Sequence, residues 1–148
     1  MLSMTDFPEI FRRVLLDHYR HPRGMVRLEQ PTHRAFGRNR TCGDEVEVEL
    51  CLGPDGCITE FGYVVRGCSI TTATASMLSE VLPGLDRSGV SRLTRSLENQ
   101  LEGELDSEGE AGSLPGQLSV LAGLRGVPAR HACARVVWET VGRAMESI

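Results

Sequence analysis

Hydrophobic and polar residues alternate along one short stretch near the middle of the chain. The alternating apolar residues are Val46, Val48, Leu50 and Leu52. Single glutamate or cysteine residues separate them, and this period of two is typical of a strand with one buried face. The Gly-Pro-Asp-Gly sequence at residues 53–56 predicts a turn. A second strand, rich in β-branched and aromatic residues, is predicted over residues 57–65, so the two strands would form a hairpin.

Apolar residues recur every three or four positions in several other stretches, which is typical of amphipathic helices. The first helix is expected to be capped by Thr5 or Asp6, to carry Pro8 in its first turn and to end before Pro22. Its apolar face would consist of Phe7, Phe11, Val14, Leu15 and Tyr19. The later helices are predicted over residues 69–82, 90–101, 118–126 and 128–147.

The predicted strands are grouped together and most of the predicted helices follow them, which favours an α+β fold. We expect a small antiparallel sheet of two to three strands with helices packed on one face. Residues 23–40 are polar and irregular, and their periodicity does not decide whether they add a strand. The acidic residues 102–113 are expected to form an exposed loop. The length of 148 residues fits one domain over residues 1–148.

Charge and composition narrow the range of partners. The formal net charge of −4 argues against nucleic acid, because phosphate binding depends on clustered lysine and arginine. No apolar run reaches the roughly 20 residues needed to cross a membrane, and the first residues lack the features of a signal peptide. We therefore expect a soluble, cytoplasmic protein without a membrane or nucleic-acid partner. The five cysteines, an odd number, favour metal or thiol chemistry over a disulfide framework.

Cys42 and Asp44 flank a single glycine just before the alternating strand. Glycine lets the backbone turn so that both side chains can point to one place, and a thiolate with a carboxylate can hold zinc or iron. The alternative is a local turn in which Asp44 bonds to its own backbone and the cysteine is incidental. The spacing alone weights the two interpretations about equally.

Two further cysteines lie where helices are predicted to begin. Cys68 follows Gly67 at a strand-to-helix junction, where exposed N–H groups and the helix dipole favour the thiolate. Cys133 lies at the start of the last helix, and Arg130, three residues earlier, can share its face. The alternative is that both thiols are small buried side chains and that Arg130 is solvated. A metal site shared with Cys42 is a hypothesis here, since the spacings match neither a zinc ribbon nor a CxxC pair.

The remaining cysteines and the histidines receive no role in this site. Cys51 and Cys57, close to the predicted turn, are interpreted as bystanders. His18 and His21 fall at the end of the first helix, where a cation complements the helix dipole. His131 is two residues from the last cysteine, so their side chains would point about 200° apart on a helix and would not share a metal.

Four motifs along nearly the whole chain resemble those of the U-type iron–sulfur cluster assembly family, which includes IscU, SufU and the N-terminal part of NifU. Residues 17–23 (DHYRHPR) are similar to the family's DHYxxPR, and residues 41–44 (TCGD) are similar to its TCGD. Residues 67–76 (GCSITTATAS) are similar to its GCSI and AS pair, and residues 128–133 (PARHAC) to its PARxxC. Four motifs in the right order make the resemblance specific.

Within this family the chain is most similar to the SufU branch. IscU carries a histidine immediately before its third cysteine, where this chain has Ala132. The stretch between Cys68 and Cys133 is longer than in IscU. The LPPVK-type segment of IscU has no good match, because residues 126–130 read GVPAR.

The resemblance implies a zinc ion held by Cys42, Asp44, Cys68 and Cys133, a ligand set that suits tetrahedral zinc. It also implies a zinc-dependent sulfurtransferase that accepts persulfide sulfur from a SufS-like cysteine desulfurase and passes it toward a SufB-type scaffold complex. Cys42 would be the accepting thiol and would leave the zinc when a histidine of the desulfurase replaces it. Arg130 would help to position or stabilise the site. Asp44, as the single oxygen ligand, would be the most labile.

Two other functions stay open for the same residues. The first is a non-catalytic scaffold that assembles and transfers a transient 2Fe–2S cluster, because the ligand sets of zinc, iron and clusters overlap. The second is a structural zinc module whose metal only supports folding. The sequence decides neither whether the protein is an enzyme nor its oligomeric state.

Overall fold

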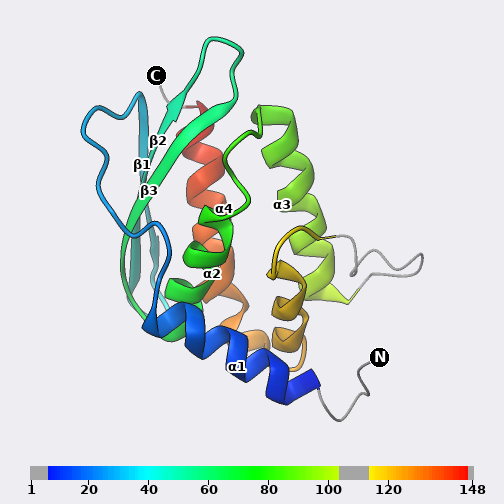
Figure 1. Cartoon of the computed structure of the whole chain (residues 1–148). Helices are drawn as coiled ribbons and strands as arrows, with labels where there is room; N and C mark the ends of the chain where they lie inside the picture. Colours follow the sequence, from blue (N-terminus) through cyan, green and yellow to red (C-terminus); the bar gives the residue numbers. More distant parts are fainter. Residues whose placement is uncertain (1–6, 104–113, 147–148) are drawn as a thin grey trace.

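The sheet is antiparallel and its strands lie in the order β1-β2-β3 (Figure 1). The structure is a computed structural model that describes residues 7–103 and 114–146. Within these residues the strands are β1 (His33–Asn39), β2 (Asp44–Leu52) and β3 (Ile58–Arg66). The pairing of β1 with β2 places Asn39 opposite Asp44 at one end of the sheet. The predicted α+β fold with a small antiparallel sheet is confirmed, and β1 supplies the third strand.

Helices pack on one face of this sheet (Figure 1). The helices of the described residues are α1 (Phe7–Arg20), α2 (Ser69–Ser79), α3 (Arg87–Glu102), the 3₁₀ helices η2 (Leu118–Leu124) and η3 (Pro128–Arg130), and α4 (His131–Glu146). α4 lies along β1 and β2, and α2 lies against β3, while α1 and α3 pack on these two helices. None of them is long and apolar enough to cross a membrane.

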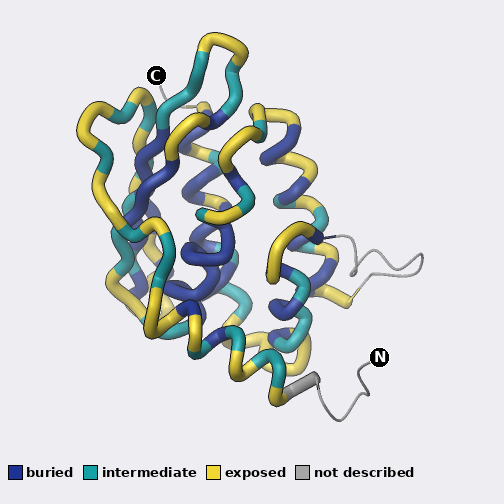
Figure 2. The backbone as a smooth tube through the Cα atoms, in the orientation of Figure 1, coloured by how far each residue is buried: buried dark blue, intermediate teal, exposed yellow. Residues whose placement is uncertain are grey.

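The core lies between the sheet and the helices, where the tube of Figure 2 is mostly dark blue. The inward face of β2 supplies Val46, Val48 and Leu50, all fully buried. These are residues that the alternating pattern predicted to face inward. Trp138 of α4 and Leu97 of α3 are buried on the helical side, so the core joins both layers of the fold.

α4 approaches β1 so closely that a side chain at position 37 has no room. A Cβ atom at Gly37 would overlap Oγ1 of Thr140 in α4. The other positions on this face of β1 are His33, Ala35 and Asn39, which are small or polar, whereas Phe36 is exposed. The strand therefore shows no alternation of apolar residues, and for this reason the periodicity of residues 23–40 could not reveal it.

Some of the sequence expectations for the helices need correction. Tyr19, expected on the apolar face of α1, is 46% exposed. The inward stripe passes instead through Leu15 to His18, and Tyr19 lies one residue, or about 100°, beyond it. The predicted caps Thr5 and Asp6 lie outside the described residues, as do residues 104–113 of the acidic segment.

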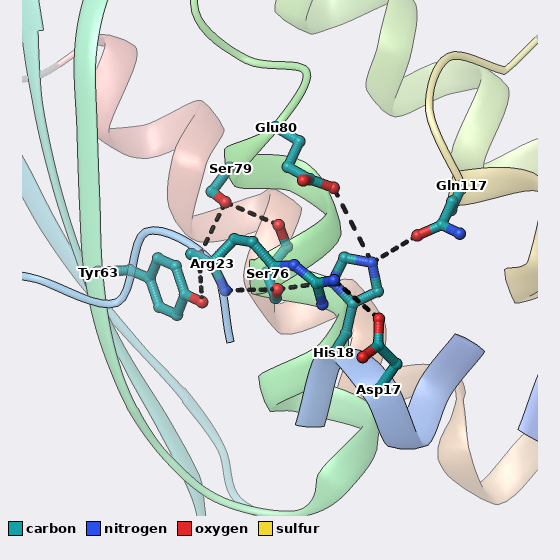
Figure 3. A network of polar contacts seen from close by, with 8 residues as sticks. All are labelled: Asp17, His18, Arg23, Tyr63, Ser76, Ser79, Glu80 and Gln117. Carbon is teal, nitrogen blue, oxygen red and sulfur yellow. Dashed lines mark hydrogen bonds and ion pairs between the residues drawn. The ribbon is translucent and has the colours of Figure 1, made fainter. Parts of the chain in front are cut away.

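His18 is a buried residue rather than a surface cation at the end of α1. Figure 3 shows its ring between α1, α2 and the segment before η2. Its Nδ1 lies 2.6 Å from Oγ of Ser76 in α2, and its Nε2 donates to Oε1 of Gln117 at 2.7 Å. His18 thus connects three parts of the chain that are distant in sequence.

The residues that follow α1 extend the same network (Figure 3). The carbonyl of Arg23 accepts hydrogen bonds from the Tyr63 hydroxyl at 2.7 Å and from Oγ of Ser79 at 2.9 Å. The Arg23 N–H donates to Oγ of Ser76 at 2.8 Å, and its guanidinium binds Asp17 at 2.7 Å. The DHYRHPR residues therefore hold α1 and the following chain against α2 and β3.

Candidate metal centre

The turn between β1 and β2 brings the first two candidate ligands to one end of the sheet. Gly43 has a φ of +78°, in the left-handed region that favours glycine, and its N–H donates to the Asn39 carbonyl at 2.7 Å. Cys42 is exposed on this turn, whereas Asp44 is only 1% exposed. A single glycine thus separates an exposed thiol from a buried carboxylate.

The start of α2 holds the Asp44 carboxylate in place. Cys68 is the N-cap of α2, and its backbone N–H donates to Oδ1 of Asp44 at 2.9 Å. A Cβ atom at Gly67 would lie 2.5 Å from the same oxygen, so glycine is what allows this close approach. Asp44 therefore bonds across the fold to a residue 24 positions away.

Cys133 completes a group of three potential ligands. It lies in the first turn of α4 and is 0% exposed. Its Sγ is 3.7 Å from Sγ of Cys42, and the ligand atoms of Cys42, Asp44 and Cys133 all lie within 4.8 Å of one another. Zinc–sulfur bonds of about 2.3 Å in a tetrahedral site separate neighbouring sulfurs by about 3.8 Å. The spacing of the two sulfurs therefore fits zinc.

Cys68, the fourth predicted ligand, lies beside this group. The ligand atoms of the other three residues all lie within 4.8 Å of one another, and the Cys68 thiol does not belong to that group. It lies 3.5 Å from Oγ1 of Thr71. The structure thus brings together three of the four predicted ligands. Metal binding stays a prediction for all four residues.

Burial affects the pKa values of Asp44 and Cys133 in different ways. Burial acts to raise the pKa of Asp44, but hydrogen bonds from the Cys68 N–H and from Asn39 outweigh it and hold the pKa below its usual value. Burial raises the pKa of Cys133, and the nearby Asp44, Cys68 and Cys42 add to the increase. Without a metal, Asp44 is therefore ionised and Cys133 is a neutral thiol, so a metal must displace a proton to bind there.

Arg130 is an exposed cation beside the thiols. Its hydrogen bond with Cys133 raises the pKa of the guanidinium, and the nearby Cys68 and Cys42 add to this effect. Three thiolates and a carboxylate around a divalent ion carry a formal charge of about −2, which a guanidinium can partly offset. Arg130 and Cys133 are in contact, as expected from residues three positions apart at the start of a helix.

The other cysteines and His131 do not join this group. The Cys51 thiol donates to the Gln30 carbonyl at 3.4 Å, and burial raises the pKa of Cys57, beside the hairpin turn. Nε2 of His131 lies 2.7 Å from the Leu124 carbonyl. Among the described residues, the ligand group therefore contains none of the three.

Asn39 touches two of the candidate ligands, although it was not among the site residues predicted from the sequence. Its side chain is 6% exposed, and its Nδ2 donates to Oδ2 of Asp44 at 3.0 Å and to Sγ of Cys133 at 3.6 Å. The signal that could have found it is the length of the turn. Once β1 is known to end at Asn39, the turn of residues 40–43 places it opposite Asp44.

The fold and this centre define a small α+β domain in which two cysteines and an aspartate lie close enough together to hold a metal ion. The chain matches the family model described as NifU-like N terminal domain over residues 10–134. It therefore belongs to this family, the U-type group that includes IscU and SufU. The resemblance inferred from the four motifs is confirmed.

Several known proteins are similar over nearly their whole length. The zinc-dependent sulfurtransferase SufU of Bacillus subtilis (strain 168) is 29% identical over 143 residues, which cover 95% of this chain and 92% of the relative. The iron–sulfur cluster assembly scaffold protein IscU of Thermotoga maritima is 25% identical over 142 residues and 96% of both chains. The crystal structure of a putative scaffold protein for the SUF system from Fervidobacterium islandicum AW-1 has a TM-score of 0.80 at 20% identity, covering 90% of this chain and 94% of that one. That structure supports the fold alone.

Proposed function

We propose that this protein acts in iron–sulfur cluster assembly as a zinc-dependent acceptor and carrier of persulfide sulfur in the cytoplasm. Its sulfur donor would be a SufS-like cysteine desulfurase, and its recipient a SufB-type scaffold complex. The observation that carries the proposal is the unequal exposure of the three ligands. Cys42 is exposed, whereas Asp44 and Cys133 are buried at the same centre. One thiol is thus available to a partner protein while its neighbours stay inside the fold.

The donor set fits zinc in kind and in spacing. Cys42, Asp44, Cys68 and Cys133 would hold the ion, and the 3.7 Å separation of the Cys42 and Cys133 sulfurs suits tetrahedral bonds. Bound zinc would keep the thiols deprotonated, and the thiolate is the nucleophilic form. The similarity to a SufU named as zinc-dependent supports the choice of metal.

Sulfur transfer to Cys42 would follow ordinary thiol exchange. The Cys42 thiolate attacks the outer sulfur of the persulfide on the desulfurase. A sulfur–sulfur bond to Cys42 forms, the sulfur–sulfur bond on the desulfurase breaks, and the desulfurase cysteine leaves as a thiolate. The hydrogen on the outer sulfur moves with that sulfur, so the step consumes no oxidant or reductant.

Arg130 would serve the same reaction from the rim of the centre. Its guanidinium contacts Cys133 and lies close enough to Cys42 for their charges to interact. A cation in this position stabilises thiolates in the centre and can stabilise the thiolate that leaves the desulfurase. We therefore assign Arg130 to the positioning and stabilisation of the reacting sulfurs.

The direct test is to map the transferred sulfur. The protein is purified without oxygen, incubated with a SufS-like cysteine desulfurase and cysteine, and analysed by mass spectrometry after digestion. We expect one extra sulfur atom on Cys42, and we expect Cys42→Ala to abolish both this mass increase and the stimulation of the desulfurase. The matched control is Cys57→Ala, which removes a cysteine away from the centre and should leave transfer unchanged. Normal persulfide uptake by Cys42→Ala would contradict the proposal.

The second candidate function is a scaffold that assembles and transfers a 2Fe–2S cluster. It is favoured by the IscU scaffold protein, which is 25% identical over 96% of both chains. The same cysteines could hold a cluster, since ligand sets overlap. Metal analysis of the anaerobically purified protein separates the two functions, because iron with sulfide favours a scaffold and stoichiometric zinc favours sulfur transfer. Zinc with no transferable sulfur would instead point to a structural module.

A further inference from the structure

Asn39 is the last residue of β1, and the strand register places it directly opposite Asp44. Its side chain is buried beneath the turn that carries Cys42. It contacts one ligand from β2 and one from α4, because its amide reaches both Asp44 and Cys133. These contacts join ligands that lie 89 positions apart in the sequence (133 minus 44).

The orientation of the Asn39 amide is determined by its surroundings. The backbone N–H of Thr41 can only donate, and it lies 3.2 Å from Oδ1 of Asn39. Oδ1 must therefore face the turn, so Nδ2 faces the centre. Both hydrogens of Nδ2 then have acceptors, namely Oδ2 of Asp44 at 3.0 Å and Sγ of Cys133 at 3.6 Å.

These two bonds match what an anionic metal centre requires. The four predicted ligands and a divalent ion carry a formal charge of about −2, and hydrogen-bond donors around the ligands stabilise that charge and orient the ligand atoms. Each carboxylate oxygen of Asp44 accepts a hydrogen bond. Oδ2 accepts from the Asn39 amide, and Oδ1 accepts from the Cys68 backbone N–H. Cys42 is the exposed member of the same group.

We propose that Asn39 is a positioning residue of the metal centre. It holds Asp44 and Cys133 as the fixed part of the ligand set, so that Cys42 is the ligand free to leave and react. This inference rests on the proposed metal site and concerns the order in which its ligands are released. It reverses the sequence-based expectation that Asp44 is the most labile ligand.

Two variants separate the donor function of Asn39 from its role in the turn. Asn39→Ala removes the whole amide. Asn39→Asp keeps an oxygen that can accept from the Thr41 N–H but replaces the donor with an oxygen that repels Asp44 and the Cys133 thiolate. We expect zinc affinity, measured by competition with a chromogenic chelator, to fall by about 10–100-fold in both variants. An Asn39→Asp protein that binds zinc as tightly as the wild type, or more tightly, overturns the proposal.

Gln100→Ala is the matched control for a simple loss of a buried amide. Gln100 is also buried, but its Nε2 donates to the Leu118 carbonyl at 3.1 Å and not to a ligand. We expect this variant to lower the melting temperature of the metal-free protein without changing zinc affinity. If Gln100→Ala weakened zinc binding as much as Asn39→Ala, the effect of Asn39 would be general destabilisation and the proposal would fail.

The absorption spectrum of the cobalt-loaded protein gives a second measurement, which would not change if Asn39 only stabilised the fold. A hydrogen bond to a thiolate lowers the energy of its sulfur electrons, so its removal shifts the sulfur-to-cobalt charge-transfer band to longer wavelength. We expect this shift in Asn39→Ala loaded with cobalt, and no shift in Gln100→Ala. An unchanged band in Asn39→Ala overturns the assignment of the Cys133 contact.

The outcome for Asn39 is distinguishable from the outcome for sulfur transfer. A wild-type protein that binds zinc but accepts no persulfide contradicts the proposed function, while the effect of Asn39 on zinc affinity still stands. If the wild-type protein accepts persulfide but the Asn39 variants have normal zinc affinity and a normal cobalt spectrum, the proposed function stands and the proposal for Asn39 fails. A wild-type protein that binds neither zinc nor cobalt overturns both proposals.

Discussion

The backbone N–H of Cys68 donates a 2.9 Å hydrogen bond to Oδ1 of Asp44. This bond connects the start of α2 to the start of β2, and it brings Cys68 and Asp44 together without using the Cys68 thiol. The same approach of backbone to carboxylate is possible only because residue 67 is a glycine. The fold itself therefore determines the arrangement of the Asp44 carboxylate beside the start of α2.

A methyl group at position 67 should disturb the centre directly. In Gly67→Ala the new Cβ would lie 2.5 Å from Oδ1 of Asp44, so the carboxylate must move. We expect zinc affinity to fall by at least about tenfold, a typical cost of disturbing the groups around a metal. Gly126→Ala is the matched control, because a Cβ there meets no atom within 4 Å. Chelator competition measures both, and equal affinities would contradict this description of the centre.

The contact between α4 and β1 predicts opposite effects for two glycine substitutions. Gly37→Ala places a methyl group against Oγ1 of Thr140 and should destabilise the protein by about 1–3 kcal/mol, as overpacking does. Gly142→Ala, within α4, meets no atom within 4 Å and should stabilise it by about 0.5–1 kcal/mol through better helix propensity. Urea unfolding gives both values. A neutral Gly37→Ala would show that the two elements can separate at little cost.

Loss of the His18 side chain should destabilise the protein far more than loss of its neighbour His21. His18→Ala leaves the buried Ser76 and the exposed Gln117 without their hydrogen bonds to the ring, and the loss at Ser76 in particular should cost about 1–3 kcal/mol. His21 is exposed, and His21→Ala should change stability by less than about 0.5 kcal/mol. Thermal unfolding at one pH compares the two. Similar effects from both variants would argue against a buried network around His18.

Tyr63 should make the protein less stable at alkaline pH. Burial raises the pKa of its hydroxyl to about 12, whereas an unfolded tyrosine titrates near about 10. The stabilisation is complete below the unfolded value and is lost as the pH rises from there through the folded value. Tyr63→Phe loses the bond to the Arg23 carbonyl, worth about 1 kcal/mol, but should show a flatter decline above pH 10. Denaturation at stepped pH tests this, and parallel curves would contradict it.

The predictable part of the fold was the part whose residues alternate or recur in local patterns. The inward residues of β2, such as Val48, and the buried stripe of α3 follow simple periods. β1 could not be found in this way, because α4 packs so close that its inward positions, including Gly37, carry little or no apolar side chain. The identity of such a strand depends on its neighbours rather than on its own pattern.

In the candidate site, too, some residues could be predicted from local sequence patterns and others could not. Cys42, Asp44 and Cys133 could be proposed from motifs, because each is itself a ligand type. Asn39 carries no such signal, and its role depends on a strand register that the sequence did not reveal. The partners of His18 are likewise 58 and 99 residues away in the chain, beyond the reach of any local pattern.

The 3.7 Å separation of the Cys42 and Cys133 sulfurs spans 91 positions of sequence. An ion that bonds both sulfurs would cross-link the chain and close a loop that contains most of its residues. The conformational entropy lost on closing a loop grows with the length of the loop. An ion that binds the folded chain more tightly than the unfolded chain would raise the melting temperature with each increment of occupancy. Melting temperatures recorded during a metal titration would therefore report the fraction of protein with an occupied centre, whichever ion binds.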